Sequence, residues 1–205
     1  MRLKPTAPFF YGSVPSTSTK EKKSWQVETF EQSEVLGLMS EGLEIVVRAA
    51  LIGTGGTLAL DLWNTFLKHA FGVPSLSVGM LGRWFGHFPR GRFKHDIIAE
   101  ASPIPGERLI GWSAHYTIGI TWAALLLAIW GLDWARHPTL LPALIVGLVT
   151  LVAPFFIMQP GMGLGIAASK TPNPNAARLK SIASHIVYGI GLYGSAVLST
   201  LLIRS

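Results

Sequence analysis

Residues 139–159, Thr-Leu-Leu-Pro-Ala-Leu-Ile-Val-Gly-Leu-Val-Thr-Leu-Val-Ala-Pro-Phe-Phe-Ile-Met-Gln, contain no charged side chain. An α-helix rises about 1.5 Å per residue, so a helix of this length extends about 30 Å, which is the thickness of the hydrocarbon core of a bilayer. The segment therefore predicts a transmembrane helix, and it points to the fold class of the whole chain.

Three further apolar segments are long enough to cross a bilayer. Hydrophobic residues make up 49% of the chain and charged residues only 14%, which is more apolar and less charged than a typical soluble domain. The first segment is weakened by Arg48, Asp61 and Asn64, but its flanks still fit a span. We predict an all-α polytopic membrane protein, a four-transmembrane-helix bundle with spans at about residues 44–67, 109–131, 139–159 and 183–203.

The segment before the first span has a different composition. Residues 1–38 are rich in Ser, Thr, Pro, Lys and Glu without a sustained period, which predicts a disordered tail. Met39 stands just before the first span, so a further hypothesis is that translation begins there and that residues 1–38 lie upstream of the true start. The membrane domain is then predicted to be residues 39–205.

The net charge of +6 is explained by the placement of the basic residues. The two loops between spans one and two and between spans three and four carry Lys68, Arg83, Arg90, Arg92, Lys94, Arg108, Lys170, Arg178 and Lys180, whereas the opposite side has Arg48, Arg136 and Arg204 near span ends. By the positive-inside rule, both basic loops are expected in the cytoplasm and both termini outside, with the chain in the inner (plasma) membrane. This distribution predicts a lipid bilayer as partner, and no nucleic acid.

The first basic loop contains an amphipathic pattern. Leu81, Trp84, Phe85 and Phe88 are spaced to lie on one face of a helix, and Ser75 or Ser77 can cap it. This spacing predicts a short interfacial helix, whose basic side contacts anionic lipid headgroups. The alternative is a phosphate or carboxylate site. The residues expected to make these headgroup or anion contacts are Arg83, His87, Arg90 and Arg92.

Polar residues occur in all four spans at one depth, in the leaflet that faces the basic loops. They are Asp61, Asn64, His115, Tyr116, Gln159 and His185. An ionisable group at membrane depth costs several kcal/mol unless it is paired, so Asp61 is a candidate functional residue. In the second span, His115 lies on a ridge of small residues with Gly111, Gly119 and Ala123, and such ridges pack against neighbouring helices. Asp61, His115 and His185 are therefore expected to point into the bundle.

Several chemistries could use these residues. A neighbouring Asp and His can relay protons, because burial brings the pKa of both groups toward the working pH. Asp61, His115 and His185 could also hold a divalent metal, and the two histidines could ligate a haem iron. The absence of HExxH and CxxCH motifs, and of any cysteine, argues against both groups, so no cofactor is predicted. The remaining alternative is that these polar side chains only hydrogen-bond one another to hold the helices together.

Several separated motifs resemble a family of bacterial membrane proteins known as domain of unknown function 2938. The resemblance covers about residues 45–203 and rests on Asp61-Leu62-Trp63-Asn64, Phe71-Gly72-Val73-Pro74-Ser75, Gly82-Arg83-Trp84-Phe85-Gly86-His87, Gly111-Trp112 with His115-Tyr116, Met158-Gln159-Pro160-Gly161-Met162-Gly163, and Ser169-Lys170-Thr171-Pro172. It implies an integral membrane protein of about four spans. The family brings no known activity, substrate or catalytic residue to this chain.

The leading functional hypothesis is a small transport-like protein that handles protons or ions, with Asp61 as proton acceptor, His115 as its partner, and Gln159 and His185 completing the cavity. Four spans rarely enclose a gated pathway, so a homo-oligomer or a larger membrane complex is expected. A metal-dependent enzyme embedded in the membrane, with Arg83, Arg90 and Arg92 bringing its substrate, and a structural or assembly subunit are the alternatives. An enzyme is the less favoured of these classes.

Overall fold

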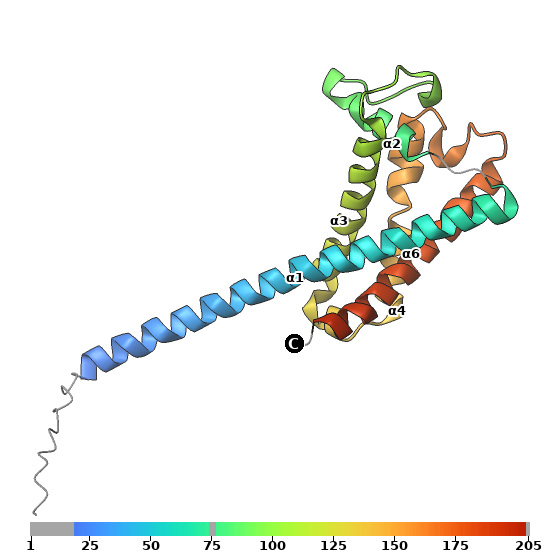
Figure 1. Ribbon diagram of the computed structural model, residues 1–205. Coiled ribbons are helices and arrows are strands. Elements are labelled where there is room, and N and C mark those ends of the chain that lie inside the picture. The colour runs from blue at the N-terminus through green and yellow to red at the C-terminus, as the bar shows by residue number, and fades with distance from the viewer. Residues whose placement is uncertain (1–18, 74–76, 204–205) are drawn as a thin grey trace, which may run out of the picture. The chain divides into compact units, whose positions relative to one another are not determined.

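The computed structural model describes residues 19–73 and 77–203, and within these ranges the chain is helical without strands (Figure 1). The helices are α1 (Thr19–Phe71), α2 (Val78–Gly86), α3 (Glu107–Arg136), α4 (Leu140–Val149), α5 (Gln159–Gly161) and α6 (Pro174–Leu202), with short turns η1 (Phe88–Arg90), η2 (Ile98–Glu100), η3 (Pro154–Met158) and η4 (Ile166–Ala168). Four segments are long and apolar enough to cross a membrane, namely Met39–Phe71, Glu107–Arg136, Leu140–Gly161 and Pro174–Leu202. The predicted all-α fold with four spans is confirmed.

The chain divides into two units, residues 1–42 and 43–205, and the second unit contains the residues of interest. Of the predicted disordered tail, residues 1–18 lie outside the described residues, whereas residues 19–38 continue helix α1. Helix formers such as Lys, Glu, Gln and Leu are frequent in residues 19–38 and proline is absent there, which accounts for the difference. A start at Met39 stays a prediction.

Within the second unit, α1 lies directly against α3 and α6. A Cβ added to Gly53 would come within 2.5 Å of the Ile120 Cα in α3, and one added to Gly191 in α6 would come within 3.0 Å of the Gly56 Cα in α1. Small residues permit such close backbone approach between membrane helices. The Tyr188 hydroxyl of α6 also donates to the Gly119 carbonyl of α3 at 2.9 Å, so the three helices form one packed group.

The third span is interrupted where the sequence predicts a continuous segment. Helix α4 ends at Val149, and the π-helical turn η3 follows from Pro154 to Met158. Pro154 has no backbone N–H, so it cannot donate to the carbonyl of Thr150, and the helical ladder is broken there. Before the break, α4 packs on α6 so closely that a Cβ on Gly147 would lie 2.6 Å from the His185 carbonyl.

The short helix expected in the first loop is present as α2, and Ser77 caps it, accepting the Met80 amide at 3.2 Å. Ser75, the other predicted cap, lies outside the described residues. The apolar side of α2 is not wholly free for lipid, because Trp84 is buried in a cluster with Ile98 and Met162. Helix α2 is therefore held against the rest of the protein.

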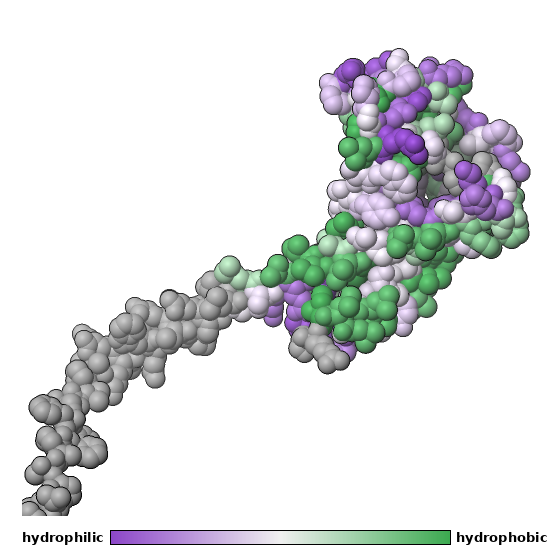
Figure 2. All heavy atoms as spheres, in the orientation of Figure 1, coloured by the Kyte–Doolittle hydropathy of each residue, from purple (hydrophilic) through white to green (hydrophobic). Residues whose placement is uncertain are grey.

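Large hydrophobic side chains are exposed on the spans. Leu62 is 62% exposed, Leu141 67% and Leu198 60%. On the face drawn in Figure 2, hydrophobic residues gather over α1, α4 and α6, and hydrophilic residues gather at the end that carries α2. An apolar surface of this extent is typical of a protein that lies in a lipid bilayer.

Candidate functional site

The register of α1 against α3 positions the candidate site. The two helices cross in close contact, with Gly53 against Ile120 and Thr57 against Gly119. One helical turn farther along α1 and one turn back along α3, the same register sets Asp61 opposite His115. The small residues that bring the two backbones together therefore also bring these polar side chains together.

The Asp61 carboxylate has a partner for each oxygen. His115 Nε2 lies 3.0 Å from Asp61 Oδ1, and the Tyr116 hydroxyl donates to Oδ2 at 3.1 Å. The Asp61 and His115 side chains each keep 23% of their surface exposed. The arrangement is a partly accessible carboxylate that shares hydrogen bonds with two groups able to release a proton.

Asn64, one turn after Asp61, connects α1 to α6. Its amide nitrogen donates to the Leu60 carbonyl at 3.0 Å, and the Ser184 hydroxyl donates to Asn64 Oδ1 at 3.4 Å. Asn64 therefore extends the polar line of α1 toward α6 but makes its contacts separately from Asp61.

His185 and Gln159, predicted to complete the same cluster, make their contacts elsewhere. His185 Nδ1 lies 2.6 Å from Thr150 Oγ1, at the point where α4 ends. Gln159 is 7% exposed at the start of α5. Within the described ranges there is no group of three or more His, Cys, Asp or Glu side chains able to hold a metal, so Asp61, His115 and His185 do not form the ligand triad considered from the sequence.

The predicted anion-contact residues also separate into two groups. Arg83 forms a two-pronged pair with Glu107, at 2.8 and 3.0 Å, and donates to the Ala99 and Ala101 carbonyls. The Glu107 carboxylate raises the pKa of the Arg83 guanidinium further. Arg83 is therefore a positioning residue that ties α2 to α3.

His87 is only 3% exposed, and its Nε2 lies 3.0 Å from the Ser102 carbonyl. Arg90 and Arg92 remain exposed in the segment after α2. Of the four residues expected at headgroups, these two alone have exposed side chains in the described structure.

A buried charge network that was not predicted from the sequence lies near the start of the Met39–Phe71 span of α1. The Arg48 side chain is 1% exposed and pairs with Glu44 at 2.7 Å, while Arg136 of α3 pairs with the other Glu44 oxygen at 2.7 Å. Arg48 also donates to the Ala135 carbonyl and to Ser199 Oγ of α6. The four-residue spacing of Glu44 and Arg48 was the available signal, since such pairs share one helix face.

Comparison with known proteins identifies the family of this chain. A model of proteins of unknown function, DUF2938, matches residues 50–199. Comparison with curated proteins and with solved structures gave no significant match. The matched range holds Asp61, His115 and Tyr116 together with most of the four spans, and the chain belongs to the DUF2938 family.

Proposed function

We propose that this membrane protein handles protons through Asp61, His115 and Tyr116, as part of a small transport-like activity. The observation that carries the proposal is the pairing of one carboxylate with an imidazole and a phenol, all on candidate membrane spans. A charged carboxylate at membrane depth is expensive, so such groups are retained mainly where they act or pair.

The contrast with the Arg48 network supports this assignment. Arginine does not release its proton in proteins, so the pairs that Glu44 makes with Arg48 and Arg136 are permanent. Asp61 is instead paired with His115, and an imidazole, unlike a guanidinium, can both accept and donate a proton. A proton moved between Asp61 and His115 converts an ion pair into a neutral pair, and neither side chain is fully enclosed by protein, since each keeps 23% of its surface exposed.

Proton movement in proteoliposomes tests the proposal. The full chain is reconstituted with a pH-sensitive dye inside, and a potential is imposed across the membrane. We expect internal pH changes with the wild type, none with Asp61→Asn, and slower changes with Tyr116→Phe, because the phenol orients the carboxylate but does not carry the charge.

Asp133→Asn is the matched control, since Asp133 lies exposed near the other end of α3 and should leave the flux unchanged. Equal flux in wild type and Asp61→Asn, or no flux in the wild type, contradicts the proposal. In that case these residues serve only to pack α1 on α3.

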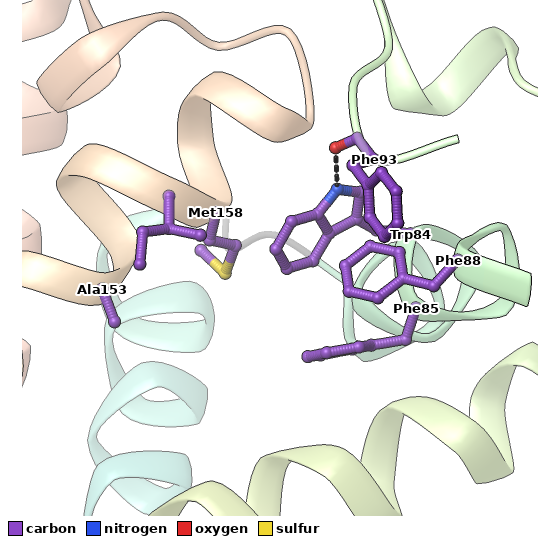
Figure 3. Close-up of a pocket in the computed structure, with 7 residues that line it drawn as sticks. Trp84, Phe85, Phe88, Phe93, Ala153 and Met158 are labelled. Atoms are coloured by element: carbon purple, nitrogen blue, oxygen red, sulfur yellow. Dashed lines mark hydrogen bonds between the residues drawn. The ribbon is translucent and has the colours of Figure 1, made fainter. Parts of the chain in front are cut away.

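Lipid contact at the first basic loop is a second part of the proposal. An apolar crevice of about 390 Å³ lies between α2 and the η3 region (Figure 3). Arg90, Arg92 and Lys94 are exposed and lie close in the chain to its lining residues Phe88 and Phe93. The crevice is lined by Trp84, Phe85, Phe88, Phe93, Ala153, Ile157 and Met158. An anionic phospholipid fits this juxtaposition, with an acyl chain in the crevice and its headgroup at the basic residues.

The basic loops are assigned to the cytoplasm of the inner membrane, on the balance of basic residues between the two sides. An assembly of several copies, or a complex with other membrane proteins, completes the pathway that four spans alone do not enclose.

A further inference from the structure

Two histidines that the proton-handling proposal does not use form a buried pair. His87 is 3% exposed at the end of α2 and His95 is 5% exposed in the loop that follows. Their ring centroids are 4.9 Å apart. The His95 amide donates to the Gly161 carbonyl at 2.8 Å, which joins this loop to α5.

Three of the four ring nitrogens of this pair have no hydrogen-bond partner among the described residues. His87 Nε2 lies 3.0 Å from the Ser102 carbonyl, an acceptor, so Nε2 carries the hydrogen and Nδ1 presents a lone pair. His87 Nδ1 and both ring nitrogens of His95 are buried without a hydrogen-bond partner among the described residues. Buried polar atoms are normally paired, so an unpaired set needs an explanation.

Gln159 adds a third unsatisfied group to the same region. Its Oε1 is buried without a partner among the described residues, and Gln159 stands two residues before Gly161, which accepts the His95 amide. The unpaired atoms of these side chains present at least three acceptor lone pairs and one ring N–H, that of His95. A neutral, acceptor-rich centre of this kind favours a cation over an anion.

We propose that His87 and His95 bind a monovalent soft metal ion, Cu(I). Imidazole is a preferred ligand of copper, and thioethers select Cu(I). Three methionines pack in the adjoining cluster, with Met162 buried at its centre and Met80 and Met158 against it.

The charge of the ion follows from the ligands. The cost of burying an ion rises with the square of its charge, and the candidate donors are neutral. Structural zinc sites use four ligands and catalytic ones three, whereas no group of three or more His, Cys, Asp or Glu side chains exists in the described ranges. Two imidazoles suffice for Cu(I), which accepts low coordination numbers.

An anaerobic titration tests the site. The detergent-purified full chain competes with a chromophoric Cu(I) chelator, and we expect one ion per chain. His95→Gln and His87→Asn should each weaken binding about tenfold or more. Loss of a residue that only supports a metal ligand already lowers metal affinity by about 10- to 100-fold, and loss of a ligand itself should cost at least as much. His137→Asn is the matched control, because His137 is exposed and far along α3.

X-ray absorption of the copper-loaded wild type keeps the test independent of whether the variants fold. We expect an absorption edge typical of Cu(I) and, beyond the edge, scattering from two imidazole ligands. No bound ion, or binding unchanged in His95→Gln, overturns the proposal and leaves ordered water as the partner of these nitrogens. Binding of Zn²⁺ but not Cu(I) through His87 and His95 overturns the assignment to a monovalent ion.

Discussion

Arg48 and Asp61 are charged side chains on the same helix, and their partners give them different roles. The Arg48 guanidinium is buried and donates to Glu44, to Ser199 and to the Ala135 carbonyl. The Asp61 carboxylate is partly exposed and is paired with His115 and Tyr116. The Arg48 network therefore joins three helices, whereas the Asp61 cluster is the one on which the proposed proton handling rests.

Replacing Arg48 should be strongly destabilising. Arg48→Met removes the partner of Glu44 on its own helix and leaves the Ala135 carbonyl unpaired, and breaking a buried ion pair costs about 3 kcal/mol. Arg48→Lys should recover only part of this, because an ammonium lacks the planar fork that reaches several acceptors. Unfolding in detergent measures both changes.

Arg108→Met is the control for the loss of an arginine, since Arg108 is exposed at the start of α3. Surface substitutions usually change the free energy of unfolding by about 0.5 kcal/mol or less. If Arg48→Met is no more destabilising than Arg108→Met, the buried network does not stabilise the fold.

At the scale of the elements, the contact between α2 and α3 depends on the absence of a side chain at Gly82. A Cβ there would collide with the Glu107 carbonyl, whereas a Cβ on Gly79, one turn earlier, would meet Arg108 Cγ at an ordinary 3.7 Å. The Arg83–Glu107 pair lies beside this contact. The first loop is therefore held in place by close packing and one ion pair.

Gly82→Ala should loosen α2 from α3, while Gly79→Ala should be neutral or slightly stabilising. Forcing a methyl group into a packed contact costs about 1–3 kcal/mol. At Gly79, where there is room for the methyl group, the higher helix propensity of alanine should stabilise the helix slightly. Hydrogen exchange of residues 78–86, measured by mass spectrometry, reports the difference. Equal protection in the two variants would mean that α2 is held by other contacts.

The basic segment after α2 should set the preference for anionic lipid. In nanodiscs of mixed composition, Arg90→Gln, Arg92→Gln and Lys94→Gln together should reduce the anionic lipid retained with the purified protein. Each basic residue near an anionic surface contributes about 1 kcal/mol.

The charge-conserving pair Arg90→Lys and Arg92→Lys should keep the lipid preference, which separates charge from the shape of the arginine side chain. A neutral phosphatidylcholine nanodisc serves as the second control. Unchanged anionic lipid in the glutamine variant contradicts the assignment of this segment to headgroups.

For the whole molecule, the topology is open to direct measurement because the chain has no cysteine. A single cysteine introduced by Glu100→Cys lies in the first basic loop, one introduced by Ala176→Cys lies in the first turn of α6 just after the second basic loop, and one introduced by Thr139→Cys lies in the turn between α3 and α4. All three positions are exposed. In intact cells, a membrane-impermeant thiol reagent should label only the cysteine at position 139. Labelling at positions 100 and 176 instead would reverse the orientation.

The Asp61–His115 pairing could be anticipated because both residues lie on stripes of polar or small residues at three- and four-residue steps. Gly111, Gly119 and Ala123 of the α3 stripe are indeed buried. The same reasoning placed His185 and Gln159 in one cluster with Asp61, but depth in the membrane does not determine which neighbour a side chain faces. His185 faces α4 through Thr150, and the break at Pro154 ends α4 beside it.

The all-helical fold and the number of candidate spans were determined by the sequence itself, because they depend on hydropathy and on a constant rise per residue. The helix ends were not, since the last helix begins at Pro174 and not near residue 183. The tertiary structure alone decided the partners, as it directed Arg83 to Glu107, Arg48 to Glu44, and His87 to His95. Partners depend on which helix faces meet and how closely, and contacts such as Gly53 on Ile120 and Gly82 on Glu107 set those distances between residues far apart in the chain.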